Sequence, residues 1–140
     1  MVSKIVDRTL IVRAVPGEDL IVKIEEACKE HGVRLGIVSG IGACDHATVG
    51  AYSVRTKEYT AHTFDEEMEI LALMGNITTM NGEYYGHMHA TLGREDGSVV
   101  GGHANELVIS ATSEVFIQIL DGTLDRIRDE EVGLNVLELA

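Results

Sequence analysis

The sequence predicts one α+β domain over residues 1–140, composed mainly of antiparallel, sandwich-like β-sheet with one main helix near residues 18–31. Three observations lead to this prediction. A chain of 140 residues is long enough for one domain with its own hydrophobic core. Hydrophobic residues make up 45% of it and charged residues 24%, which is typical of globular proteins and argues against a disordered chain. Apolar residues recur at helical spacing in one segment only, and apolar runs between turn residues occupy the rest.

The N-terminal part of the chain is expected to form a strand and then the helix. Residues 4–13 alternate in polarity, as a half-buried strand does. From Leu20 to Cys28 the apolar residues recur at helical spacing, and Asp19 stands in the expected first turn. Gly32 follows the last helical residue, a position where glycine commonly ends a helix.

After the helix the sequence indicates strands almost to its end. Segment 67–75 is rich in residues that also suit a helix, but it continues into the β-branched residues 77–79 and is therefore assigned to a strand. Asn81-Gly82 is the strongest hairpin signal of the chain, and Glu95-Asp96-Gly97 marks a second turn. The expected strands cover residues 33–43, 46–54, 57–64, 67–75, the segment after Asn81-Gly82, 98–104 and 106–120, followed by two short strands around a polar loop that ends at Gly133.

The charge of the chain restricts its partners. Eleven Lys and Arg residues stand against 23 Asp and Glu residues, which gives a formal net charge of -12. Non-specific affinity for DNA comes mainly from Lys and Arg on phosphates, and no basic run occurs here. Direct DNA binding by this chain and attraction to an anionic membrane are therefore disfavoured.

Targeting and cysteine patterns point to a cytoplasmic protein. The N-terminus has no uninterrupted apolar stretch of the kind found in signal peptides, and no segment reaches the ~20 apolar residues of a membrane-spanning helix. Cys28 and Cys44 are not spaced as a zinc or redox pair. We expect Cys28, on the buried side of the predicted helix, to be a free thiol that packs as a small hydrophobic residue.

Three histidines form the candidate metal site. His87 and His89 stand two residues apart in an expected strand, so their side chains project from one face. His89 lies seven residues before Asp96, the centre of the second turn, and His103 lies seven residues after it. In an antiparallel hairpin His89 and His103 would face each other. Three converging neutral imidazoles suit Zn²⁺ with an open fourth coordination position.

Residues around these histidines are candidates for a ligand site or second shell. Gly101 and Gly102 would let a ligand or another strand come close, and Glu83 and Asn105 are the polar candidates. The structural alternative is that the three histidines are satisfied inside the sheet or at a subunit interface. His46 and His62 occur singly in strands and are expected at exposed or core-edge positions.

The stretch from Gly82 to Gly102 is also similar to the first motif of the cupin family, with a glycine, an HxH pair, an acid and a glycine in order. Two spacings differ from that pattern, because Glu95 is one residue too far from His89 and Gly82 is one residue too close to His87. The early helix does not suit a cupin jelly roll. A cupin-like enzyme is therefore kept as a minor alternative.

Over residues 5 to about 137 the sequence resembles the PPC domain family (plants and prokaryotes conserved). The resemblance implies an α+β sandwich-like fold, assembly as a homotrimer, and a histidine cluster near the subunit boundary that binds metal in some prokaryotic relatives. The motifs that carry it are Pro16-Gly-Glu-Asp-Leu20, Gly36-Ile-Val-Ser-Gly-Ile-Gly42, Ala47-Thr-Val-Gly50, Glu69-Ile-Leu-Ala-Leu-Met-Gly-Asn76, His87-Met-His-Ala90 and Gly101-Gly-His103.

Features of the plant members of this family are missing here. The Arg-Gly-Arg-Pro core of the fused AT-hook does not occur. The Gly-Arg pair of the plant Gly-Arg-Phe-Glu-Ile-Leu stretch is replaced by Glu66-Glu67. The sequence thus predicts a stand-alone member of the family, without the plant type of DNA hook or partner contact.

Two functions from different classes remain open. The first is a homotrimeric protein that binds a divalent metal, zinc, through His87, His89 and His103, with a hydrolase-like activity as a minor variant. The second is an oligomeric regulatory or interaction module of the PPC DNA-binding-protein family, which would contact DNA weakly or through partners. Segment 66–74 is the place to look for a partner face, although its alternating acidic and apolar residues fit an ordinary half-buried strand better. No complete catalytic set is found, so the sequence does not decide whether the protein is an enzyme.

Overall fold

A computed structural model describes all residues from 1 to 140. One helix and nine strands make up the chain, and the helix follows the second strand. They are β1 (Val2–Val6), β2 (Thr9–Arg13), α1 (Leu20–His31), β3 (Gly36–Ser53), β4 (Glu58–Phe64), β5 (Met68–Met80), β6 (Glu83–Arg94), β7 (Val99–Ile119), β8 (Arg126–Asp129) and β9 (Leu134–Leu137).

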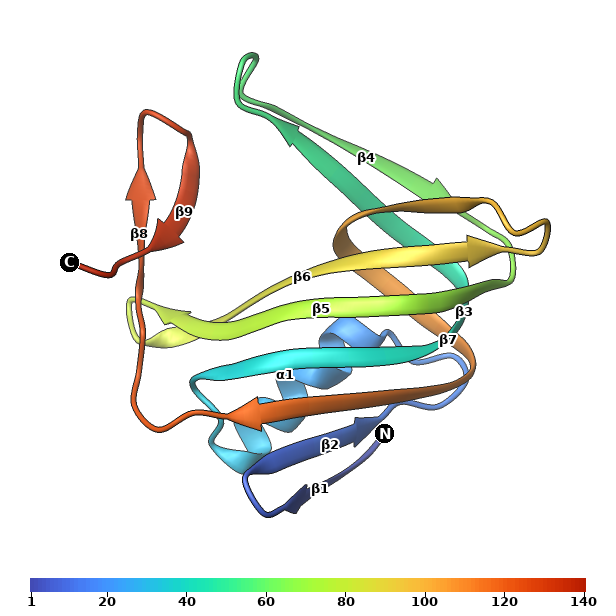
Figure 1. The fold of residues 1–140 in the computed structure, drawn as a ribbon, viewed down its shortest axis with the longest axis horizontal. Helices are drawn as coiled ribbons and strands as arrows, with labels where there is room; N and C mark the ends of the chain where they lie inside the picture. The colour runs from blue at the N-terminus through green and yellow to red at the C-terminus, as the bar shows by residue number, and fades with distance from the viewer.

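Seven of the strands form one antiparallel sheet in the order β1-β2-β7-β6-β5-β3-β4. Strand β7 also pairs with β3, so that β3, β5, β6 and β7 form a closed ring. The α+β prediction is confirmed, and the two layers expected of a sandwich are parts of one continuous sheet. Figure 1 shows α1 on one side of this sheet, with the β3–β4 and β8–β9 hairpins projecting beyond its closed part.

The N-terminal segment differs from the single strand expected over residues 4–13. The chain turns at Asp7-Arg8, where Asp7 has a φ of 53°, and β1 pairs with β2 from Val6 and Thr9 outward. Asp19 is the N-cap rather than a residue of the first turn, because its carboxylate accepts a hydrogen bond from the Ile21 backbone N–H. The helix ends at Gly32 in the left-handed conformation, as predicted.

Two pairs of expected strands are single long strands. The break expected at Cys44 is wrong, because the Cys44 side chain is fully buried and β3 continues past it with a shift of register. The break expected near Asn105 is also wrong, since β7 stays paired with β3 on both sides of it. The short final strands around a polar loop are confirmed as β8 and β9.

The hairpin at Asn81-Gly82 is confirmed. Both residues have positive φ, 52° and 77°, as the tight turn between β5 and β6 requires. This turn fixes Asn76 opposite His87 and Met74 opposite His89. Because side chains alternate along a strand, one face of β5 and β6 carries the histidines and the other faces the core.

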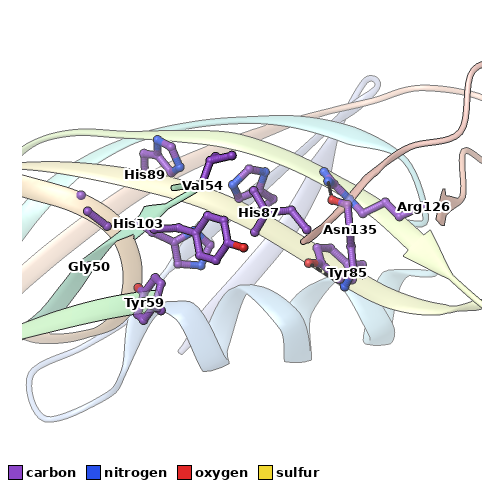
Figure 2. Close-up of a pocket in the computed structure, with 13 residues that line it drawn as sticks. Gly50, Val54, Tyr59, Tyr85, His87, His89, His103, Arg126 and Asn135 are labelled. Carbon is purple, nitrogen blue, oxygen red and sulfur yellow. Dashed lines mark hydrogen bonds between the residues drawn. The ribbon is translucent and has the colours of Figure 1, made fainter. Parts of the chain in front are cut away.

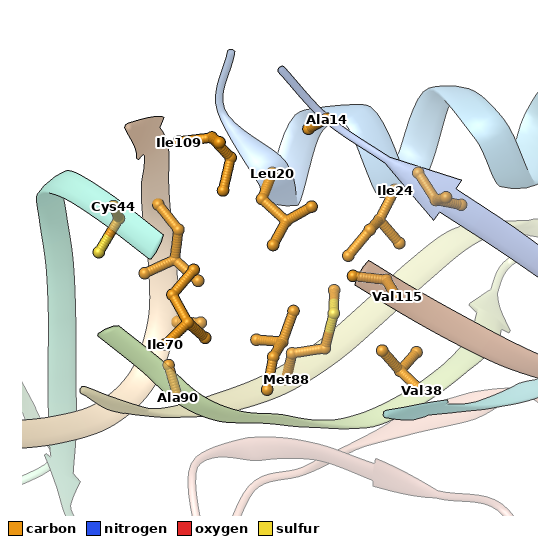
Figure 3. Packing of buried hydrophobic residues seen from close by; sticks show 14 of the residues in the cluster. Ala14, Leu20, Ile24, Val38, Cys44, Ile70, Met88, Ala90, Ile109 and Val115 are labelled. Carbon is orange, nitrogen blue, oxygen red and sulfur yellow. The ribbon is translucent and has the colours of Figure 1, made fainter. Parts of the chain in front are cut away.

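The hydrophobic core lies between α1 and the inner face of the sheet (Figure 3). Leu20 and Ile24 of α1 are fully buried there, together with Val38 of β3 and Leu73 of β5. The histidine-bearing face of β6 is on the opposite side of the sheet from this core. The single helix, α1, is too short to cross a membrane.

Candidate metal centre

The three histidines predicted as ligands come together on β6 and β7. One ring nitrogen from each of His87, His89 and His103 lies within 4.8 Å of the others. The ring centroids form a nearly equilateral triangle, with separations of 5.1, 5.2 and 5.7 Å. Figure 2 shows the three rings turned toward a shared space.

The protonation state of these histidines suits metal binding. Burial lowers the pKa of His87 to about 4, and the nearby charge of Arg126 acts in the same direction. Burial also lowers the pKa of His103, and His89 adds to this shift. An imidazole binds a metal ion only in its neutral form, so His87 and His103 need to release no proton at neutral pH. Three imidazoles within this spacing fit a divalent ion such as zinc that keeps an open position.

Tyr59 of β4 supports the cluster from one side. Its ring meets the His103 ring edge-on at 6.1 Å, and its hydroxyl donates a hydrogen bond to Asn105 Oδ1. The ring lies so close across β3 that a Cβ on Gly50 would stand 2.3 Å from the Tyr59 hydroxyl. Glycine at position 50 therefore makes room for the tyrosine that packs on His103.

The residues expected to surround the histidines take different positions. Gly102 lines the histidine pocket, and a Cβ on it would lie 2.4 Å from the Gly50 carbonyl, while Gly101 faces Ala90 in the same close manner. At both glycines, the group that comes close to the backbone is therefore the neighbouring strand. Asn105 reaches the cluster only through Tyr59. Glu83 is exposed at the start of β6 and does not line the pocket.

The other two histidines singled out in the sequence lie outside the cluster. His62 is exposed on β4. His46 is half-buried on β3, where its ring contacts the carboxylates of Asp65 and Glu106. Their expected exposed or edge positions are confirmed.

A pocket of about 610 Å³ opens over the histidines. Its walls come from the β3–β4 hairpin, from β6 and β7, and from the β8–β9 hairpin. Figure 2 shows Arg126, Tyr85 and Asn135 beyond His87, away from His89 and His103. The pocket residues are Gly50, Ala51, Tyr52, Val54, Tyr59, Tyr85, His87, His89, Gly102, His103, Arg126, Leu134 and Asn135.

Sequence reasoning missed Arg126, the one arginine of this pocket. Arg126 is 7% exposed, whereas its neighbour Ile127 is 50% exposed. The polarity pattern of this segment predicts the reverse, because an apolar residue is normally the buried one in a short strand. No sequence pattern indicated that the tyrosines of the β3–β4 hairpin line the pocket either, since aromatic residues are common in strands.

A family model and several solved structures match most of this chain. The model of the Plants and Prokaryotes Conserved (PCC) domain matches residues 1–121. A candidate DNA-binding protein from Bacteroides thetaiotaomicron is 31% identical, with 98% of this chain and 96% of that chain covered and a TM-score of 0.95. A metal-containing protein from Archaeoglobus fulgidus is 34% identical, with 99% of each chain covered and a TM-score of 0.88.

A third solved structure, a plant- and prokaryote-conserved (PPC) protein from Pyrococcus horikoshii, is 29% identical. The similarity covers 95% of this chain and 92% of that chain, with a TM-score of 0.86. The search of curated proteins found no match.

Proposed function

This chain belongs to the Plants and Prokaryotes Conserved domain family, and from this premise we propose that it is a homotrimeric protein that binds one zinc ion per chain through His87, His89 and His103. The observation that carries the proposal is the convergence of the three ring nitrogens within 4.8 Å. A similar structure, 34% identical, is that of a metal-containing protein, which supports a metal in this chain as well.

The histidines would hold the ion, and the rest of the pocket would shape what reaches it. A zinc ion held by three histidines supplies Lewis acidity at an open coordination position. Tyr59 fixes the His103 ring, and the β8–β9 hairpin closes the far side of the pocket. No Asp or Glu lines the pocket, so the hydrolase-like and cupin-like alternatives lack a carboxylate base there. The site is therefore better suited to binding a ligand.

The trimer is supported by an apolar area on the outer face of the sheet. We name it the apolar strip, and it consists of Ile37, Ile41, Leu71, Met74 and Phe116, each about half exposed. The strip crosses β7, β3 and β5 and reaches the metal centre, because Met74 is the register partner of His89. A contiguous exposed apolar area of this kind marks a protein contact surface.

Metal content measured by inductively coupled plasma mass spectrometry, on protein purified without a histidine tag, tests the zinc assignment. We expect about one zinc per chain in the wild type and none in His89→Ala. His62→Ala is the matched control, since His62 is exposed on β4 outside the cluster, and it should keep its zinc. Zinc retained by His89→Ala, or absent from the wild type after incubation with zinc and dialysis, would contradict the assignment.

A second candidate function is a regulatory or interaction module. The observation in its favour is the similarity to a candidate DNA-binding protein at 31% identity. The net charge of -12 favours contact with DNA through a partner protein rather than directly. A gel-shift assay at low and moderate salt distinguishes direct DNA binding from DNA contact through a partner. A specific shift by the purified protein alone would favour direct binding.

A further inference from the structure

Arg126 is a buried cation without a counter-ion. Its side chain makes three hydrogen bonds, from Nε to Thr78 Oγ1 at 2.8 Å, from Nη2 to Asn76 Oδ1 at 2.8 Å, and from Nη1 to the Asn135 carbonyl at 3.2 Å. All three acceptors are neutral. The guanidinium also lies over the Tyr85 ring, 4.7 Å from its centroid. The other paired arginines of the chain are more accessible and contact carboxylates, as the exposed Arg8 and the half-buried Arg94 do.

The cost of this arrangement favours an anionic ligand at Arg126. A buried charge is strongly disfavoured unless it is paired, and an arginine stays protonated in proteins. A guanidinium carries five N–H groups, of which three are used here, so two remain available. Arg126 also lines the histidine pocket, so a molecule in the pocket can reach it.

The pocket has no negative charge of its own. None of its 13 lining residues is Asp or Glu, although the chain contains 23 of them. Arg126 carries the one fixed positive charge of the lining and lies beyond His87 (Figure 2). A divalent ion bound at the histidines would add two further positive charges. The pocket is thus an electropositive hollow in an acidic protein.

The walls are apolar and flat. Three of the four tyrosines of the chain line the pocket, and Val54 and Leu134 add aliphatic surface. Tyr52 and Tyr59 already donate their hydroxyl protons, to the Val132 carbonyl and to Asn105 Oδ1, and the Tyr85 hydroxyl accepts a hydrogen bond from Asn135. What remains exposed to a ligand is mainly ring and aliphatic surface, which binds an apolar molecular body.

We propose that the pocket binds a small organic carboxylate with an apolar body, whose carboxylate pairs with Arg126 while the rest of the molecule extends between the tyrosines toward the three histidines. This deepens the proposed metal-binding function and rests on it for the histidine end of the site. The Arg126 end is supplied by the β8–β9 segment, which lies beyond the residues 1–121 that match the family model.

Isothermal titration calorimetry on the zinc-loaded trimer tests the proposal with matched pairs of probes, acetate against acetamide and cyclohexanecarboxylate against cyclohexanecarboxamide. Each pair differs in charge and hardly in shape. We expect each carboxylate to bind at least tenfold more tightly than its amide, and the cyclohexane compound more tightly than acetate. Equal affinities within both pairs would overturn the proposal.

Asn76→Asp provides the decisive variant. It places a carboxylate where the Asn76 amide oxygen accepts the bond from Arg126 Nη2, so the guanidinium gains an internal partner without loss of volume. Carboxylate affinity should fall at least tenfold. Asn81→Asp, which adds the same charge in the exposed turn between β5 and β6, should leave it unchanged. Arg126→Gln should reproduce the loss, and unchanged affinity in Asn76→Asp would overturn the proposal.

Metal content measured on the same samples separates this proposal from the zinc assignment. Asn76→Asp should keep its zinc. If the wild type holds zinc but shows no preference for carboxylates, the Arg126 proposal fails alone. If the wild type holds no zinc but binds carboxylates in a manner sensitive to Asn76→Asp, the anion site stands and the zinc assignment fails.

Discussion

His89 on β6 and His103 on β7 are direct register partners, and the same register continues to Gly93 and Val99 beside the turn. The ladder between these strands therefore holds the two imidazoles on one face, at a ring separation of 5.7 Å. A slip of one residue would turn His103 to the opposite face of the sheet. The candidate metal centre thus depends on the length of the β6–β7 turn as much as on the histidines themselves.

Because Tyr59 packs against Gly50, we expect the effect of a larger residue at position 50 on stability to depend on the side chain at position 59. In Gly50→Ala the new Cβ would stand 2.3 Å from the tyrosine hydroxyl, so the Tyr59 ring must shift from its place beside His103. We expect a loss of about 1–3 kcal/mol in the free energy of unfolding, the usual cost of overpacking. The same substitution in a Tyr59→Ala background should cost far less, because the space is then free. Urea denaturation of the four proteins checks this, and equal costs in both backgrounds would contradict the contact.

His46 predicts a pH dependence of stability. The hydrogen bond that His46 donates to the Asp65 carboxylate raises the pKa of His46 in the folded protein, and the charge of Glu106 adds to this. A raised folded pKa contributes stability that is complete below the unfolded pKa of about 6.5 and is lost as pH rises through the folded pKa. Relative to His46→Gln, the wild type should lose stability as pH rises above about 6.5. The effect should stay within about 1 kcal/mol, because this pair is partly exposed to solvent.

Chemical denaturation at several pH values measures this difference. Asp65→Asn should remove most of the pH dependence that His46→Gln removes, since Asp65 is the main partner. A difference between wild type and His46→Gln that grows with pH would contradict the assignment.

The two cysteines should be unreactive in the folded protein. Cys28 and Cys44 are buried free thiols, and burial raises the pKa of Cys28 to about 12 and that of Cys44 to about 11. Because the thiolate is the reactive form, Ellman's reagent at pH 8 should label neither residue before unfolding and both in denaturant. Rapid labelling of native protein would show that the core around α1 opens readily.

The apolar strip predicts where the proposed trimer can be disrupted. Phe116, 49% exposed at the β7 end of the strip, should be essential for assembly if the strip forms the interface. Phe116→Asp should lower the mass measured by multi-angle light scattering, with the circular dichroism spectrum preserved. Ile127→Asp is the matched control, since Ile127 is equally exposed, at 50%, but lies on β8 outside the strip. Equal masses for wild type and Phe116→Asp would remove the strip from the interface.

Much of the fold could be predicted because its signals are local. The apolar spacing from Leu20 and the position of Gly32 define α1 within about one turn, and Asn81-Gly82 defines a hairpin. The single strand predicted over residues 4–13 is wrong, because the chain turns at Asp7-Arg8 and forms β1 and β2 there. The reason is also local. Asp7 adopts the left-handed conformation that aspartate tolerates, and nothing in the polarity pattern of residues 4–13 signals that turn.

By itself, the sequence determined the histidine face, because a period of two along each strand and a turn centred on Asp96 are enough to pair His89 with His103. Only the tertiary structure decided what surrounds that face. The closure of β3 on β7 places Gly50 against Gly102, and the final hairpin brings Arg126 to within hydrogen-bonding distance of Asn76, 50 residues earlier in the chain. Contacts between such distant segments depend on how the whole sheet closes, so no local pattern of polarity or spacing contains them.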